Sequence, residues 1–178
     1  GKDRSGDIEK LREYDSKNAF ELMVPELETY DGIKISSSRV RNLLNQGDII
    51  GARECLGRDY MLSGTVVSGE KLGRKLGYPT ANIKLEYDYP LDGVYLTKTV
   101  IKEKSYVGLA SLGNKPTFDG SEKILEVFIL DFDEDIYSQN IEVYFLEEIR
   151  KQIKFSNQDE LIKQMNEDHK YAIINSKK

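Results

Sequence analysis

The sequence predicts a mainly β fold: an antiparallel sheet or small barrel, closed by a C-terminal helix and preceded by a smaller helical segment. From Tyr60 onward, runs rich in β-branched and aromatic residues alternate with Gly, Asp, Asn and Pro, a pattern typical of strands. These runs are YMLSGTVVSG, VYLTKTVI, KSYVGLASLG, ILEVFILDF and IEVYFLEEI. Their short connections favour hairpins over βαβ units. Beyond residue 155 the apolar spacing changes to that of a helix.

Two short helices are expected before the first strand. Ser36 to Ser38 can cap the first helix, and Gly47 can end it. Asp48 can cap the second helix, and Gly57 can end it. The net charge makes a DNA-binding pair of helices improbable, so we expect these two to pack together. The preceding residues, 1 to about 34, are highly charged and show no clear period, apart from an expected turn at Asp31-Gly32.

The C-terminal helix is predicted from both its start and its apolar face. Ser156 or Asn157 can cap it, because both side chains accept hydrogen bonds from the first free backbone N–H groups. The positions expected to face the core are Leu161, Met165 and either Tyr171 or Ile173.

Composition excludes several classes of protein. The chain has 178 residues, 39% of them hydrophobic, which is enough for a packed core. A formal net charge of −5 argues against nucleic-acid binding by a broad basic surface. Cys55 is the only cysteine, so no internal disulfide can form and a reducing cytoplasm is expected. No apolar run has transmembrane length. The chain starts without Met, and we expect it to be a processed or truncated piece of a longer protein.

Three patterns resemble known sites but lack required parts. GTVVSGEK approaches the phosphate loop G-x-x-x-x-G-K-[ST], but Glu70 stands where the lysine belongs and no Ser or Thr follows. DFDEDIYSQNIE has acidic residues at calcium-loop spacing, but Ile136 replaces the required glycine, which makes an acidic hairpin turn the better interpretation. His169 is the only histidine, so we expect a surface residue on a charged helix and no zinc site.

The segment GRKLGYPTAN, residues 73–82, has more special-purpose residues than a turn needs. Three glycines recur at every fourth position, and three cations lie between them: Gly69, Gly73, Gly77, Lys71, Arg74 and Lys75. Glycines let backbone N–H groups approach an anion, and cations strengthen the hydrogen bonds to it. A flexible basic loop that ends in a turn would have the same composition, and the spacing alone does not decide between the two.

Two oxygen-bearing side chains follow this glycine-rich segment. Pro79 stiffens the chain, and Thr80 and Asn82 then lie at alternate positions, which face the same side of an extended strand. A hydroxyl and an amide oxygen are hard ligands suited to a magnesium ion beside phosphates.

A carboxylate stands out in the run KILEVFILDF. Glu126 shares one strand face with Ile124 and Phe128, and the opposite face is also apolar. We therefore expect this carboxylate in or at the edge of an apolar environment, where it is costly unless it is paired or used. A structural ion pair is the ordinary explanation, whereas a general base for phosphoryl transfer to a hydroxyl is the functional one. An outward placement on the barrel would count against the base.

Residues 59 to 176 resemble the riboflavin kinase family, with the family's segments in the right order. The segments are SGTVVSGEKLGRKLGYPTANI, DGVYL, GLASLGNKPTF and LEVFILDFDEDIYSQNIEVYFLEEIRKQIKFSNQDELIKQM, of which P-T-A-N is the most specific. The resemblance implies a six-stranded antiparallel barrel with a C-terminal helix. It also implies phosphorylation of riboflavin to FMN, with ATP as co-substrate and Mg²⁺ as cofactor.

The same resemblance implies roles for individual residues. Thr80 and Asn82 would hold the magnesium ion, Glu126 would take the proton from the ribityl hydroxyl, and Arg150 and Phe155 would border the flavin. The residues implied to bind ATP are Gly69, Lys71, Gly73, Lys75, Gly77, Pro79, Thr80 and Asn82.

Residues 1–58 resemble the end of the FMN adenylyltransferase module that precedes the kinase in bacterial bifunctional FAD synthetases. Ser37, Ser38 and Arg41 match that module's second nucleotide-binding motif, where an arginine beside a helix N-terminus would hold phosphate. The module's first half, with its His-x-Gly-His site, is absent from this sequence. We therefore expect a short helical remnant of an α/β domain at 1–58, a kinase domain at 59–178, and no adenylyltransferase activity from this chain alone.

The function expected from these features is that of a cytoplasmic riboflavin kinase acting on two small molecules. No nucleic-acid, membrane or obligate protein partner is expected. Two alternatives stay open: a non-catalytic flavin-binding or regulatory module on the same barrel, and a flavin-using oxidoreductase on another small barrel.

Overall fold

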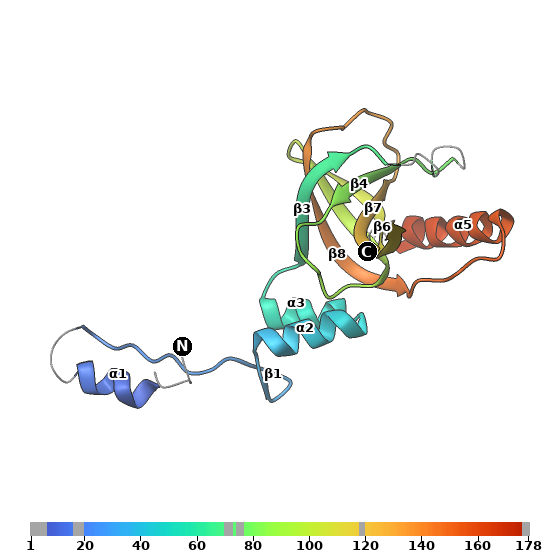
Figure 1. Ribbon diagram of the computed structural model, residues 1–178. Helices are drawn as coiled ribbons and strands as arrows, with labels where there is room; N and C mark the ends of the chain where they lie inside the picture. Colours follow the sequence, from blue (N-terminus) through green and yellow to red (C-terminus); the bar gives the residue numbers. More distant parts are fainter. Residues whose placement is uncertain (1–6, 16–19, 70–72, 74–76, 118–119, 176–178) are drawn as a thin grey trace. The chain divides into compact units, whose positions relative to one another are not determined.

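The computed structural model describes residues 7–15, 20–69, 73, 77–117 and 120–175, with side chains omitted at 114–117 and 120–122. Contacts divide the chain into two compact units, Gly1–Lys34 and Ile35–Lys178. The second unit contains a closed barrel, and Figure 1 labels the elements of both units. None of the helices in the described part of the chain is both long enough and apolar enough to cross a bilayer.

The first unit contains one short helix and one short hairpin. Its elements are α1 (Ile8–Asp15), β1 (Thr29–Tyr30) and β2 (Ile33–Lys34). The two turn residues, Asp31 and Gly32, have φ angles of 53° and 68°. Two successive positive φ angles give the tight turn that suits the right-handed twist of a hairpin. The predicted turn at this position is confirmed.

Two capped helices open the second unit. They are α2 (Ser37–Gln46) and α3 (Ile49–Leu56). The side chains of Ser36 and Asp48 accept hydrogen bonds from backbone N–H groups three residues on, at 3.2 and 2.8 Å. Gly47 and Gly57 end the helices with left-handed φ angles of 80° and 66°. All four predicted capping residues therefore have the predicted roles.

Six antiparallel strands follow and close into a barrel in the order β3-β4-β7-β6-β5-β8. They are β3 (Tyr60–Val67), β4 (Thr80–Lys84), β5 (Gly93–Ile101), β6 (Lys104–Thr117), β7 (Gly120–Ile129) and β8 (Asn140–Arg150). Each strand pairs with a neighbour on both sides, so the ring leaves no open sheet edge. The predicted six-stranded antiparallel barrel is confirmed.

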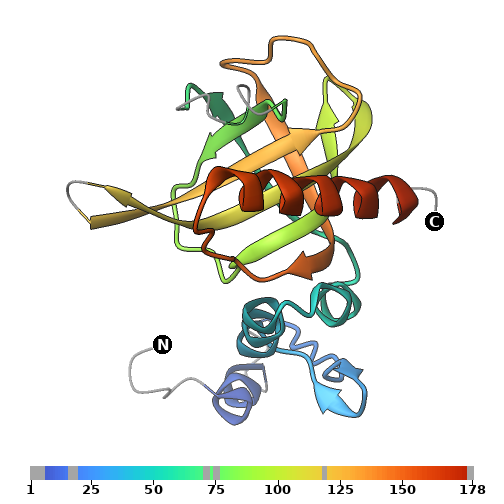
Figure 2. The same ribbon diagram turned by 90° about the vertical axis from the view of Figure 1, so that its right-hand side faces the viewer.

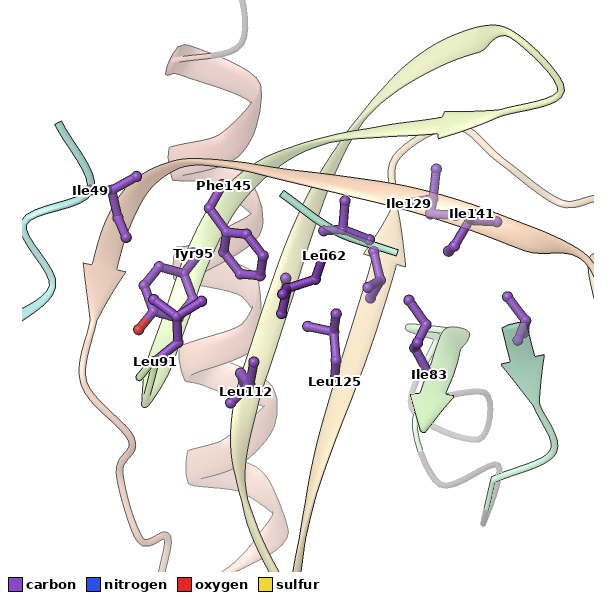
Figure 3. Packing of buried hydrophobic residues seen from close by; sticks show 14 of the residues in the cluster. Ile49, Leu62, Ile83, Leu91, Tyr95, Leu112, Leu125, Ile129, Ile141 and Phe145 are labelled. Atoms are coloured by element: carbon purple, nitrogen blue, oxygen red, sulfur yellow. The ribbon is translucent and has the colours of Figure 1, made fainter. Parts of the chain in front are cut away.

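The interior of the barrel is the main hydrophobic core, shown in Figure 3. Tyr95 and Phe145 are its largest fully buried side chains, and their rings meet edge to face with centroids 5.3 Å apart. Ile49 of α3 belongs to the same cluster. Residues 35–56 thus contribute apolar side chains to the core that fills the barrel.

Helix α5 (Gln158–Asn175) lies across the outside of the barrel, as Figure 2 shows. Asn157 caps it by accepting a hydrogen bond from the Glu160 N–H at 2.9 Å, as predicted. A second apolar cluster lies beneath the helix, formed by Leu96, Leu109, Leu130 and Ala172 with Val107, Phe128, Leu146 and Ile149 around them. Ile173 is exposed, so it does not belong to the face of α5 that packs on the barrel. The buried residues of the helix are Asp168 and Ala172.

Candidate active site

The predicted base and one predicted metal ligand lie opposite each other on neighbouring strands. Glu126 of β7 pairs in register with Asn82 of β4 on one side and with Ser111 of β6 on the other. Directly opposite residues of paired strands project from the same face of the sheet. That face is the outer wall of the barrel, because the alternate residues Leu125 and Val127 are fully buried in the core.

Helix α5 packs against the outer wall near Glu126, whose in-register neighbours Asn82 and Ser111 are both polar. Glu126 is half-buried, and its same-face neighbour Phe128 packs against His169 of α5 with ring centroids 5.6 Å apart. Glu126 therefore has the outward placement that counts against a catalytic base, and its role as base stays a proposal that rests on its register with Asn82. Both faces of β7 are apolar for separate reasons: one lines the core and the other lies beneath α5.

Glycines bring the preceding segment close to Thr80 and Asn82. A Cβ atom on Gly69 would collide with the side-chain amide of Asn82, and one on Gly73 would collide with the carbonyl of Tyr78. The Tyr78 N–H donates to the carbonyl of Gly73 at 2.8 Å, which holds the segment in this position. Only residues without a side chain fit at these two points. The described part of the segment therefore lies directly against the P-T-A-N strand.

Of the predicted loop, residues 69–77, the structure describes Gly69, Gly73 and Gly77. Gly77 has a φ angle of +85°, the left-handed region that favours glycine, and it places the exposed Pro79 at the start of β4. Lys71, Arg74 and Lys75 lie outside the described residues.

The chemistry of the donor set fits a small hard cation. Thr80 offers a half-exposed hydroxyl, and the buried Asn82 donates its Nδ2 to the Thr80 carbonyl at 3.5 Å, which leaves its Oδ1 as the acceptor atom. Both side chains are on the outer face, since Thr80 pairs with Phe128 as Asn82 pairs with Glu126. Two neutral oxygens cannot neutralise a divalent ion, so a cation here would also need negatively charged ligands.

A cavity of about 450 Å³ lies beside Thr80. Pro79 and Thr80 form one part of its lining, and residues 132–137 of the β7–β8 connection form another. The rest of the lining includes Val127 and Ile129, which face the core, and the connection contributes the carboxylates of residues 133–135.

Arg150 lies at the other end of the same wall. Val94 pairs with both Ser111 and Arg150, so one row of paired residues leads from Asn82 through Glu126 to Arg150. The Arg150 guanidinium makes a bidentate pair with Asp168 of α5, with a shortest distance of 2.7 Å, and Asp168 is only 4% exposed. The charge of Arg150 thus holds α5 on the barrel.

The segment between β8 and α5 is tied to this row as well. Gln152 donates to the Ser111 hydroxyl at 3.0 Å and to the carbonyls of Gly93 and Leu112 at 3.2 and 3.0 Å. Phe155, in the same segment, is half-buried.

The remaining predicted motif lies on α2, apart from the row. Ser37 and Ser38 are the first two residues of that helix and Arg41 follows one turn later, all three exposed. They occupy the helix N-terminus, as the sequence indicates.

Three residues of the site region were not assigned a role from the sequence: Tyr78, Asp168 and His169. His169 was expected on the surface, but its ring is half-buried between Tyr78 and Phe128, at 5.8 and 5.6 Å. Its neighbours come from distant parts of the chain, so helix composition alone gives no sign of this contact.

Comparisons with known proteins bear on the family and the fold. Residues 56–174 match the Flavokinase family model, described as riboflavin kinase. Over 173 residues the chain is 39% identical to the bifunctional riboflavin kinase/FMN adenylyltransferase of Buchnera aphidicola subsp. Schizaphis graminum, covering 94% of this chain and 55% of that protein. The corresponding protein of Listeria monocytogenes is 35% identical over 171 residues, with 94% and 54% coverage.

A solved structure shows the same fold. The crystal structure of a macrolide-efflux protein from Streptococcus pneumoniae superposes with a TM-score of 0.80 at 38% identity, covering 89% of this chain and 54% of that one. The chain spans about half the length of the curated relatives it matches. Because the family model covers most of the sequence, with its barrel and its P-T-A-N strand, the chain belongs to the riboflavin kinase family.

Proposed function

We propose that this chain transfers the γ-phosphate of ATP to the 5′-hydroxyl of the ribityl chain of riboflavin, giving FMN and ADP. The observation that supports this most directly is the in-register pair of Asn82 and Glu126. It juxtaposes an oxygen ligand suited to a metal–phosphate group with a half-buried carboxylate suited to proton removal. Phosphoryl transfer to a hydroxyl requires these two functions side by side.

Glu126 would act as the general base. Its carboxylate would accept the proton of the 5′-hydroxyl as that oxygen forms a bond to the γ-phosphorus. The bond between that phosphorus and the β–γ bridging oxygen breaks, and ADP leaves with the electron pair. The half-buried position of Glu126 would limit the access of water that could otherwise compete with the hydroxyl.

Thr80 and Asn82 would hold Mg²⁺ together with oxygens of the nucleotide. The bound ion would offset negative charge on the β- and γ-phosphates. The segment from Gly69 to Gly77, with Lys71 and Lys75, would fold over the nucleotide, and its close approach at Gly69 and Gly73 supports this. We assign the cavity beside Pro79 and Thr80 to the nucleoside of ATP, and the wall near Arg150 and Phe155 to the flavin.

We further propose that FMN is the end product and that the activity is cytoplasmic. The adenylyl transfer that makes FAD would need charge neutralisation from two sides. Of the two motifs implied by the resemblance, this chain has only the one at Ser37, Ser38 and Arg41, and its single histidine is His169. A single free, buried thiol, that of Cys55, suits a reducing compartment.

The decisive experiment is a chromatographic assay of riboflavin, ATP and MgCl₂ with the purified chain. We expect ATP-dependent FMN, and a loss of about 10²–10⁴-fold in kcat for Glu126→Gln, which keeps the shape of the side chain but cannot take the proton. Glu142→Gln is the matched control. Glu142 lies on β8, which pairs with neither β4 nor β7, and its contact is to the Tyr144 hydroxyl at 2.7 Å. Riboflavin binding without turnover would instead support a non-catalytic module.

The metal assignment has a separate test. Thr80→Ala should raise the magnesium concentration needed for half-maximal activity and weaken MgATP binding more than riboflavin binding. Thr80→Ser keeps the ligand oxygen and should be milder. An unchanged magnesium dependence in Thr80→Ala would refute the assignment.

A further inference from the structure

Helix α5 meets the wall of the proposed site through a cluster centred on Tyr78. We define the Tyr78 cluster as the rings of Tyr78, Phe128 and His169 and the amide of Asn166. The Tyr78 ring lies 5.2 Å from that of Phe128 and 5.8 Å from that of His169, both edge to face. Its hydroxyl donates to Oδ1 of Asn166 at 2.5 Å. His169 and Asn166 both belong to α5, so the cluster joins the helix to the barrel.

The cluster contacts both strands that carry the proposed site. Tyr78 immediately precedes Pro79 and Thr80, and proline stiffens the connection between them. Phe128 pairs in register with Thr80 and lies two residues from Glu126 on the same face. A shift of α5 would therefore move two strands together: β7, which carries Glu126, and β4, which carries Thr80 and Asn82.

The hydroxyl of Tyr78 has a role that its ring does not. Edge-to-face packing on Phe128 and His169 would be served equally by phenylalanine. Tyr78 is only 9% exposed, so its hydroxyl needs a partner, and Asn166 provides one across 88 positions of sequence. Arg150–Asp168 and Tyr171–Glu147 also tie α5 to the barrel, both at β8, whereas the Tyr78–Asn166 bond ties it to the segment that leads into β4.

We infer that Tyr78 is a positioning residue of the site, with Asn166 as its partner: their hydrogen bond holds α5 in place and thereby sets Thr80 for the metal–nucleotide group. The inference rests on the proposed function. It assigns to Tyr78 no contact with substrate, so its effect should appear in nucleotide affinity and in the dynamics of β4.

Tyr78→Phe and Asn166→Ala test the bond from its two ends. Each should raise KM for MgATP by about 3–10-fold, the range for loss of one partly buried hydrogen bond. The double variant should be no worse than either single one, because both changes remove the same interaction. Asn166→Asp keeps an acceptor for the hydroxyl and should restore nearly wild-type KM.

Tyr171→Phe is the matched control. Tyr171 donates to Glu147 of β8 at 2.8 Å, so this change also removes a tyrosine hydrogen bond between α5 and the barrel, but at a different strand. We expect Tyr171→Phe to lower Tm about as much as Tyr78→Phe does and to leave KM for MgATP within about twofold. Equal effects of the two variants on KM would overturn the inference.

Hydrogen exchange of the ligand-free chain gives a readout that does not depend on activity. Backbone amides of residues 80–84 should exchange faster in Tyr78→Phe than in wild type, and should be unchanged in Tyr171→Phe. If the wild-type chain makes no FMN, the proposed function fails, and the exchange measurement still decides whether Tyr78 holds β4. Unchanged exchange at residues 80–84 in Tyr78→Phe would refute the positioning role.

Discussion

The two compact units of this chain contrast in how they use apolar residues. In the first unit no described residue is buried, and the apolar side chains of α1 are 48, 43 and 49% exposed at Ile8, Leu11 and Tyr14. In the second unit, apolar residues from two helices and six strands fill one core. An eight-residue helix is marginal on its own, and burial supplies most of a helix's stability in proteins. The stability of the chain therefore resides in the second unit.

The largest expected difference between the units is in the cost of truncating a side chain. Phe145→Ala removes a fully buried ring and should lower the free energy of unfolding by about 3–5 kcal/mol. Leu11→Ala, in α1, should lower it by less than about 0.5 kcal/mol. Urea unfolding followed by circular dichroism measures both, and comparable losses would contradict the contrast.

A smaller effect is expected from pH. Burial, and next the charge of Glu148, raises the pKa of Tyr95 above its usual value of 10. The unfolded chain then loses this proton near pH 10 while the folded chain keeps it, so the stabilisation is complete below pH 10 and is lost as pH rises further. The free energy of unfolding should fall by about 1.4 kcal/mol per pH unit from this residue.

The test for Tyr95 compares slopes between pH 10 and 11. In Tyr95→Phe the free energy of unfolding should fall less steeply with pH than in wild type, because the contribution of this tyrosine is gone. A Tyr95→Phe variant with the wild-type slope would show that the tyrosine ionises equally in both states.

The smallest effect is expected from removing the first unit altogether. A chain of residues 35–178 should unfold within about 2 °C of the full chain, because the deleted residues contribute no buried side chain in the described part. It should form FMN within about twofold of the full-length rate, and neither chain should form FAD. A large loss of activity on deletion would show that the first unit supports the site.

Local signals in the sequence were enough to predict most of the fold. Ser36, Gly47, Asp48 and Gly57 cap the two helices as expected, since capping depends on a few neighbouring residues. Five of the six barrel strands were predicted from their composition, and β4 was expected only as an extended segment after Pro79. Closure into a six-stranded ring came from the family resemblance. The boundary near residue 58 and the role of the first 58 residues stay predictions.

Local signals could not predict whether the site residues face the inside or the outside of the barrel. Alternation in β7 shows that Glu126 and Phe128 share a face, but both faces are apolar, so the pattern cannot tell the inside of the barrel from the outside. That choice depends on where α5 lies, and its contacts are long-range: Tyr78 meets Asn166, and Arg150 meets Asp168. Asp168 is also a charged residue at a buried helix position, and a hydrophobic pattern does not predict its burial.

The row of paired residues from Asn82 to Arg150 restricts where the chain can gain or lose residues. Because side chains alternate along a strand, one residue inserted or deleted between Glu126 and the rest of its ladder would turn the carboxylate to the other face. Strand β7 is paired on both sides, so it has no free edge at which such a slip could be absorbed. Changes in length should therefore collect in a connection such as residues 85–92, where the chain can lengthen while Asn82 and Glu126 keep their register.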